Sequence, residues 1–145
     1  MAEETALGRP QDKLVLVVDD DESVRELLEF LVRKEGFKVQ TASDGEEGIN
    51  KIQKLLPDIV LLDLMLPRYG GFEILRQLQQ GDTSKIPIII VTGRYTDRTT
   101  AEMIRQESNV VDFLEKPVKA NILTMSLHKI LKTAAPTMKP AADPE

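Results

Sequence analysis

Several residue types are absent or scarce in this chain of 145 residues. It has no cysteine, which excludes disulfide bonds, thiolate chemistry and zinc sites built from cysteine. Tryptophan is also absent, and there are only four Phe and two Tyr. The core must therefore consist mainly of Leu, Ile and Val. Hydrophobic residues make up 41% of the chain, which at this length predicts one domain with a single aliphatic core.

The sequence also lacks long hydrophobic runs and an excess of positive charge. No apolar run approaches the roughly 18 residues of a membrane span, and the Met-Ala-Glu-Glu start does not resemble a signal peptide. The net charge is −5, which argues against direct binding to a nucleic-acid backbone and favours protein partners or a cation. We therefore expect a cytoplasmic protein that binds neither membrane nor nucleic acid.

Short apolar runs alternate with amphipathic stretches along most of the chain. The runs predict buried strands at 13–18, 37–42, 59–62, 86–91 and 110–114. Helices are predicted in the intervals and after the last strand, the first with a capping box at Ser23–Glu26 and the fourth at 99–107. This order predicts an α/β fold: a doubly wound five-stranded parallel sheet with helices on both faces.

Composition changes at both ends of this pattern. Residues 1–12 are polar, contain Gly8 and Pro10 and show no periodicity, so they predict a loose N-terminal leader. Residues 13–133 form the predicted domain, and residues 134–145 are a Pro/Ala-rich tail that buries too little apolar surface to fold. A stand-alone domain and a domain cut from a longer protein both fit this sequence.

Asp63, at the end of the third predicted strand, is the centre of the predicted site. Open α/β folds bind ligands at the carboxyl edge of the sheet, and four other polar residues follow strands there: Asp19, Asp20, Thr92 and Lys116. Three carboxylates within a few Å repel each other by several kcal/mol, and a hard cation such as Mg²⁺ relieves that repulsion. The hydroxyl and the ammonium group suit an anion formed on Asp63.

Four motifs, in this order, resemble the receiver domain of bacterial two-component response regulators. They are Val-Val-Asp-Asp-Asp-Glu, Pro-Asp-Ile-Val-Leu-Leu-Asp-Leu-Met-Leu-Pro, Ile-Ile-Ile-Val-Thr-Gly and Phe-Leu-Glu-Lys-Pro. The resemblance covers roughly residues 12–133 and implies a flavodoxin-like sheet with strand order 2-1-3-4-5. It also implies a signalling switch that is not an enzyme and catalyses only its own phosphorylation and dephosphorylation.

The resemblance implies how phosphate and metal are bound. Asp63 would be the phosphoacceptor, taking a phosphoryl group from a sensor histidine kinase or a histidine phosphotransfer protein. Mg²⁺ would be held by Asp19, Asp20 and Asp63 together with the main-chain carbonyl of Met65.

The same resemblance implies how the signal leaves the site. Thr92 and Lys116 would hold the phosphoryl oxygens, and Thr92 would couple to Phe113 as a switch. The downstream protein partner would bind the face made by the fourth helix, the fifth strand and the fifth helix. We also predict a cis peptide bond between Lys116 and Pro117, because only an X-Pro bond adopts cis at small cost.

Three other functions fit the sequence less well. A phosphatase of the haloacid-dehalogenase kind needs a second Asp two residues after the nucleophile, where this chain has Met65. A flavodoxin-like redox carrier needs a phosphate-binding loop after the first strand, and the acidic run 19–22 would repel phosphate. A docking module that is never phosphorylated has no support, since the acid, hydroxyl and lysine set is complete.

The chain departs from the usual pattern of the family in the loop after the third strand and before the fifth strand, among other positions. Arg68-Tyr69-Gly70-Gly71 brings a cation and an aromatic ring close to the site, and Ser108-Asn109 replaces the usual Gly-Ala before the fifth strand. The only histidine, His128, is predicted on the last helix as a surface or partner-facing residue.

Overall fold

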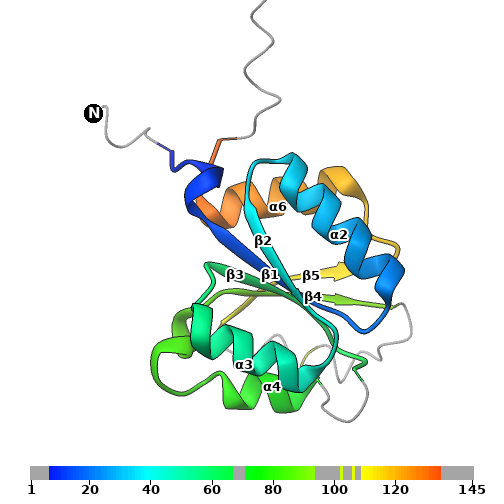
Figure 1. The fold of residues 1–145 in the computed structure, drawn as a ribbon, viewed down its shortest axis with the longest axis vertical. Helices are drawn as coiled ribbons and strands as arrows, with labels where there is room; N and C mark the ends of the chain where they lie inside the picture. Colours follow the sequence, from blue (N-terminus) through cyan, green and yellow to red (C-terminus); the bar gives the residue numbers. More distant parts are fainter. Residues whose placement is uncertain (1–6, 67–70, 94–101, 103–105, 107–108, 135–145) are drawn as a thin grey trace, which may run out of the picture.

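A parallel five-stranded sheet organises the computed structural model, which describes residues 7–66, 71–93, 102, 106 and 109–134 (Figure 1). The strand order is β2-β1-β3-β4-β5, with every neighbouring pair parallel. The strands are β1 (Leu14–Val18), β2 (Lys38–Ala42), β3 (Ile59–Asp63), β4 (Ile88–Thr92) and β5 (Val110–Glu115). The predicted fold class and strand order are confirmed.

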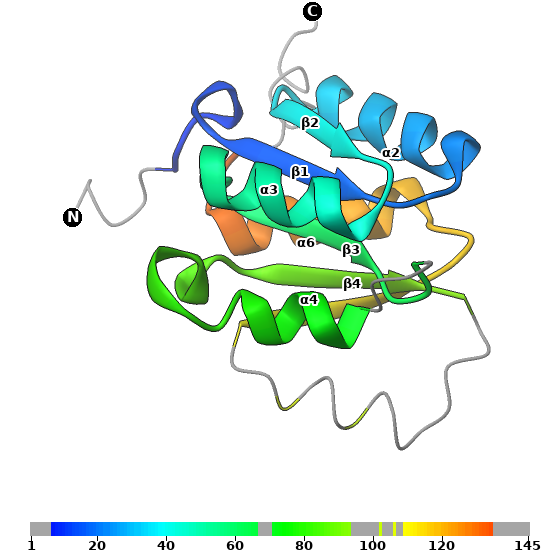
Figure 2. The ribbon, with the colours of Figure 1, turned by 60° about the horizontal axis from the view of Figure 1, so that its bottom comes forward.

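Helices cover both faces of the sheet (Figure 2). One face carries α2 (Glu22–Lys34) and α6 (Ala120–Leu131), and the other carries α3 (Gly45–Leu55) and α4 (Gly71–Gln77). Two short 3-10 helices, η1 (Pro10–Asp12) and η2 (Gly81–Lys85), precede β1 and β4. The helix predicted at 99–107 and the loop 68–70 lie outside the described residues, apart from positions 102 and 106.

The three central strands are buried on both faces, so alternate residues enter two different cores. Even-numbered β1 residues, such as Leu16 and Val18, pack toward α3 and α4, while Val15 and Val17 pack toward α2 and α6. This follows from the two-residue period of a strand. It also explains why these strands read as continuous apolar runs, with β4 composed of Ile-Ile-Ile-Val-Thr.

Acidic side chains cap the N-termini of the two helices that follow β1 and β2. Asp21 caps α2, accepting hydrogen bonds from the amides of Ser23 at 2.9 Å and Val24 at 3.2 Å. Asp44 caps α3 by accepting from the Glu47 amide at 2.8 Å. The capping box predicted at Ser23–Glu26 is wrong, because the carboxylate of Asp21 satisfies these amides two residues earlier.

The segment before β1 contacts the end of α6. The Gly8 amide donates to the Lys132 carbonyl at 2.8 Å, and Pro10 is buried. Among the described residues, no helix has both the length and the apolar character needed to cross a membrane.

Candidate functional site

The carboxyl ends of four parallel strands bring the predicted site residues to one edge of the sheet. Asp19 directly follows β1, Asp63 ends β3, Thr92 ends β4 and Lys116 directly follows β5. Asp20 is the next residue after Asp19. The parallel registers β1–β3 and β3–β4 place these strand ends side by side.

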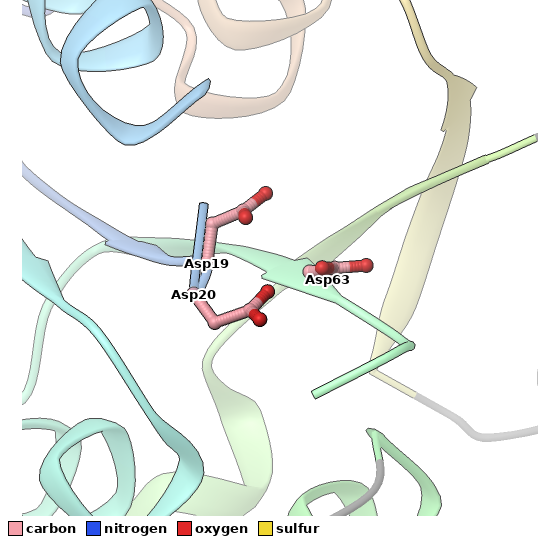
Figure 3. Close-up of side chains that lie close together, drawn as sticks. All are labelled: Asp19, Asp20 and Asp63. Atoms are coloured by element: carbon pink, nitrogen blue, oxygen red, sulfur yellow. The ribbon is translucent and has the colours of Figure 1, made fainter. Parts of the chain in front are cut away.

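Three of these residues form an acidic cluster (Figure 3). Asp19, Asp20 and Asp63 each offer a carboxylate oxygen, and these oxygens all lie within 4.8 Å of one another. Asp19 is 1% exposed and Asp63 4% exposed, whereas Asp20 is exposed. Two buried carboxylates at this separation are costly unless a cation compensates for their charge.

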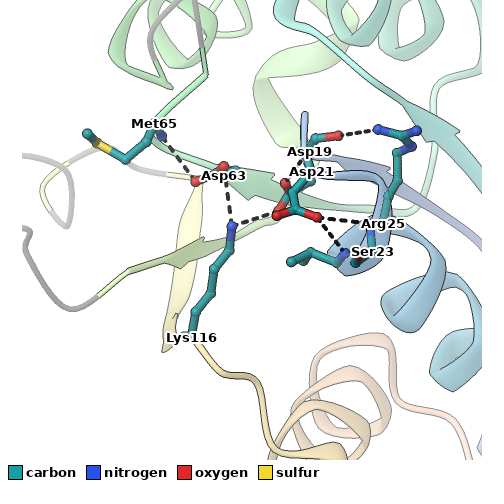
Figure 4. Close-up of polar contacts among 8 residues, drawn as sticks. Asp19, Asp21, Ser23, Arg25, Asp63, Met65 and Lys116 are labelled. Atoms are coloured by element: carbon teal, nitrogen blue, oxygen red, sulfur yellow. Dashed lines mark hydrogen bonds and ion pairs between the residues drawn. The ribbon is translucent and has the colours of Figure 1, made fainter.

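Lys116 supplies part of that compensation. Its Nζ lies 2.9 Å from Asp19 Oδ2 and 3.4 Å from Asp63 Oδ2, so one ammonium group bridges both carboxylates (Figure 4). The Lys116–Pro117 peptide bond is cis, as predicted. One positive charge against three carboxylates leaves the cluster negative.

Main-chain amides fix the other oxygen of each buried carboxylate. The Asp21 amide donates to Asp19 Oδ1 at 2.9 Å, and the Met65 amide donates to Asp63 Oδ1 at 3.1 Å. Asp19 Oδ2 is different: Lys116 is close enough for an ion pair, yet among the described residues no donor makes a well-aligned hydrogen bond to this buried oxygen. It retains the capacity to bind a ligand such as a cation.

The environment shifts the protonation equilibria of Asp63 and Lys116. Burial raises the pKa of Asp63, with Asp19 adding to the effect and the Met65 amide and Lys116 opposing it. For Lys116, burial favours the neutral form, but the ion pairs with Asp19 and Asp63 outweigh it and raise the pKa. Lys116 is therefore charged at neutral pH, and the ionised form of Asp63 is disfavoured until more positive charge arrives.

The residues present fit a hard divalent cation. Mg²⁺ takes oxygen ligands in an octahedral arrangement and usually keeps several waters, so a few carboxylates suffice. Asp19, Asp20 and Asp63 supply that donor set, and the buried Asp19 Oδ2 belongs to one of these carboxylates. The Met65 main chain contacts Asp63 through its amide; its carbonyl stays a predicted ligand.

Thr92 and Phe113 belong to the two strands beside the cluster. Thr92 is 2% exposed, and its carbonyl accepts a hydrogen bond from the Lys116 amide at 2.7 Å. Phe113 is paired with Ile90 across β4 and β5 and is partly buried against the core under α3 and α4. Their roles as phosphoryl ligand and switch stay predictions.

A second polar cluster, at the end of α2 opposite to the acidic site, was not predicted from the sequence. His128 Nε2 lies 2.8 Å from Glu35 Oε1, and His128 Nδ1 lies 2.7 Å from Thr133 Oγ1. All three side chains are buried, and the ring of Phe37 is 5.1 Å from that of His128. The prediction of a surface or partner-facing His128 is wrong. Glu35 lies 93 residues away in sequence, so no local pattern indicated this contact.

Arg25 was also missed. Its Nη1 donates to the main-chain carbonyl of Asp19 at 3.0 Å, from the first turns of α2. Only its spacing of six residues from Asp19 could have drawn attention to it.

Comparisons with known proteins agree with this geometry. Residues 15–128 match the family described as "Response regulator receiver domain". The transcriptional regulatory protein AfsQ1 of Streptomyces coelicolor is 33% identical over 118 residues, which is 81% of this chain and 51% of that protein. The sensory transduction protein RegX3 of Mycolicibacterium smegmatis is 36% identical over 129 residues, 89% of this chain and 55% of that protein. The chain thus spans about half the length of these relatives.

Solved structures with a similar fold include one chain that aligns with this protein over almost its whole length. A response regulator described as putative, from Chloroflexus aurantiacus, superposes with a TM-score of 0.74 and 33% identity, covering 82% of this chain and 97% of that one. The signal receiver domain of a LuxO repressor protein, also described as putative, from Vibrio parahaemolyticus gives a TM-score of 0.76 with 31% identity, covering 83% and 90%.

Proposed function

Because this chain belongs to the response regulator receiver domain family of two-component systems, we propose that it is a phosphoacceptor switch and that Asp63 is the residue phosphorylated. The observation that carries the proposal is the cluster itself: a buried carboxylate at the end of the central strand, with two more carboxylates and an ammonium group around it. In a receiver the phosphoryl donor is a phosphohistidine on a sensor histidine kinase or a histidine phosphotransfer protein.

In the proposed reaction a carboxylate oxygen of Asp63 attacks phosphorus. The O–P bond of an acyl phosphate forms, the P–N bond of the phosphohistidine breaks, and the leaving imidazole takes up a proton. Burial, with a contribution from Asp19, raises the pKa of Asp63, so a cation would favour its ionised form. When bound, Mg²⁺ would neutralise charge on the carboxylates and on the transferring phosphoryl oxygens.

The other site residues have complementary tasks in this proposal. Asp19 and Asp20 hold the cation beside Asp63. Lys116, already 3.4 Å from Asp63 Oδ2, turns its ammonium group to a phosphoryl oxygen once the carboxylate is esterified. Thr92 donates its hydroxyl to another phosphoryl oxygen from the end of β4. The chain acts only on its own phosphorylation state and turns over no separate substrate.

The output in this proposal is a change in binding to a downstream protein. The predicted surface combines the helix predicted at 99–107, of which only positions 102 and 106 are among the described residues, with β5 and α6. Three hydrophobic side chains on β5 and α6 support it by their exposure: Val111 at 45%, Ile122 at 45% and Met125 at 67%. The residues of this chain that align with the transcriptional regulatory protein AfsQ1 cover 51% of that protein, so we do not assign DNA binding to this chain.

Intact-mass spectrometry after incubation with acetyl phosphate tests the proposal. Wild type is expected to gain the mass of one phosphoryl group when Mg²⁺ is present and to gain none when the metal is chelated. Asp63→Asn should gain none in either case, while Asp82→Asn, which changes an exposed carboxylate on η2, should behave as wild type. Equal labelling of Asp63→Asn and wild type would overturn the assignment of Asp63.

A further inference from the structure

We infer that Arg25 is a positioning residue for the cation site, acting through the main chain of Asp19 and Asp20. This inference rests on the function proposed above and adds a residue outside the acid, hydroxyl and lysine set. The half-buried Arg25 belongs to α2, and its guanidinium reaches back past the start of that helix to the Asp19 carbonyl (Figure 4).

The first step concerns Asp20, the least supported of the three acids. Its side chain is exposed and, within the part of the chain that the structure describes, makes no hydrogen bond or ion pair. Asp19 and Asp63 are held by amides and by Lys116. The Asp20 carboxylate therefore owes its place in the cluster to the main chain that carries it.

The second step concerns the peptide between Asp19 and Asp20. A peptide unit is planar, so the direction of the Asp19 carbonyl fixes the plane that contains the Asp20 nitrogen and Cα. Arg25 Nη1 donates to that carbonyl at 3.0 Å, while the Asp19 amide donates to the Ala42 carbonyl at 3.1 Å. The first bond sets the plane after Asp19 and the second anchors the plane before it.

The third step closes the turn from the other side. The Arg25 amide donates to the Asp21 carbonyl at 2.9 Å, so both the main chain and the side chain of Arg25 hold the 19–21 turn. Mutation of a residue that orients a metal ligand through a hydrogen bond typically lowers metal affinity by about 10- to 100-fold. Arg25 stands in that relation to Asp20.

The sign of the effect separates positioning from simple electrostatics. Removing a cation from beside a negative cluster would, by charge alone, strengthen binding of another cation. Loss of positioning would weaken it. We expect Arg25→Met to weaken Mn²⁺ binding by about tenfold, the lower end of the range for such orienting groups.

Electron paramagnetic resonance of free Mn²⁺, titrated with the full chain, measures this affinity. Arg33→Met is the matched control, because Arg33 lies on the same helix but pairs with Glu29 at 2.8 Å and has no part in the turn; it should bind Mn²⁺ as wild type. Arg25→Lys, which keeps a charged donor, should recover part of the loss. Thermal unfolding without metal checks that each variant is folded.

Asp20→Asn provides the second measurement. If Arg25 acts through Asp20, Arg25→Met should weaken Mn²⁺ binding much less in the Asp20→Asn background than in wild type. Unchanged or tighter binding by Arg25→Met, or an equal loss in both backgrounds, would overturn the inference and leave the proposed function intact. A wild-type chain that binds no Mn²⁺ would overturn both.

Discussion

Lys116 Nζ and Asp19 Oδ2 are 2.9 Å apart, and within the described part of the chain this buried oxygen accepts no well-aligned hydrogen bond. The ammonium group thus occupies the neighbourhood that a divalent cation needs. We therefore expect Lys116 and a bound metal to compete for the same carboxylate, until the proposed phosphorylation of Asp63 gives Lys116 another anion to bind.

The first prediction follows from this competition. Lys116→Met should bind Mn²⁺ more tightly than wild type, by at least roughly fivefold, since a unit charge about 4 Å away is worth about 1 kcal/mol even in bulk water. The titration used for Arg25 measures it. Lys119→Met removes an exposed charge three residues later and should change little. Weaker binding by Lys116→Met would mean that Lys116 organises the site rather than competing for it.

The second prediction concerns stability and pH. Burial and Asp19 raise the pKa of Asp63 in the folded protein. Its protonated form therefore stabilises the fold at a pH below the pKa of an unfolded Asp, which is about 3.9, and this contribution is lost as the pH rises through the pKa of the folded state. Near pH 7 the ionised carboxylate is destabilising. At neutral pH and without metal, Asp63→Asn should therefore raise the melting temperature. We expect its free energy of unfolding to exceed that of wild type by roughly 1 kcal/mol.

Two further measurements check the origin of that gain. It should shrink as the pH is lowered, because wild-type Asp63 then becomes protonated, and it should shrink when Mg²⁺ is added, because the metal stabilises wild type. A melting temperature that Asp63→Asn lowers at neutral pH would contradict the predicted sign.

The third prediction concerns how closely α3 packs on β1. A Cβ added at Gly48 would lie 2.9 Å from Val18 Cγ1 and 3.2 Å from Val18 Cγ2. Gly48→Ala should destabilise the protein by roughly 1 to 2 kcal/mol, because this clash outweighs the gain in helix propensity. Asn50→Ala, exposed on the same helix, should be neutral or stabilising. Val18→Ala combined with Gly48→Ala should recover part of the loss.

The fourth prediction concerns the buried cluster of Glu35, His128 and Thr133. His128→Phe keeps a ring near Phe37 but removes both hydrogen bonds. Two buried polar groups then lose a partner, so we expect a loss of about 2 to 3 kcal/mol in urea unfolding. Adding Glu35→Leu should restore much of it, because the stranded carboxylate is then gone. Full additivity of the two changes would argue against a direct interaction.

The strand ends show what a single sequence predicts well. Continuous apolar runs ending in Asp19, Asp63 and Thr92 identify parallel strands, and parallel topology then requires their carboxyl ends to share an edge. Lys116 joins them because it directly follows β5. The convergence of the site therefore needed only the β-α order of the chain.

The missed contacts share a different origin. Glu35 and His128 meet because α2 and α6 lie side by side on one face of the sheet, a packing detail without local periodicity. In the sequence, Arg25 is one of several charged residues on an amphipathic helix. Only the structure reveals the hydrogen bond from its guanidinium to the Asp19 carbonyl. The N-cap was misplaced because Ser23 and Asp21 are both good caps, and the path of the turn decides between them.

The last prediction concerns how phosphorylation would be transmitted from the site. A phosphoryl group on Asp63 adds about −1.5 to −2 charges and new acceptor oxygens. The Thr92 hydroxyl should move toward those oxygens, vacating space into which Phe113 turns. Only the arrangement with Phe113 turned inward lets Thr92 hydrogen-bond to the phosphoryl group. The difference in interaction energy between the two arrangements therefore sets how far the equilibrium shifts.

Thr92→Ala should therefore still accept phosphate at Asp63 but fail to shift β5. Beryllofluoride, a phosphoryl mimic, allows this to be measured by NMR as chemical-shift changes along Val110–Glu115. Thr92→Ser keeps the hydroxyl and should retain the wild-type response. Because Thr92 is 2% exposed and its carbonyl accepts from the Lys116 amide, thermal unfolding must first show that both variants are folded. A full response in folded Thr92→Ala would mean that the signal reaches β5 without the hydroxyl, with the main-chain bond between Thr92 and Lys116 as the remaining direct link.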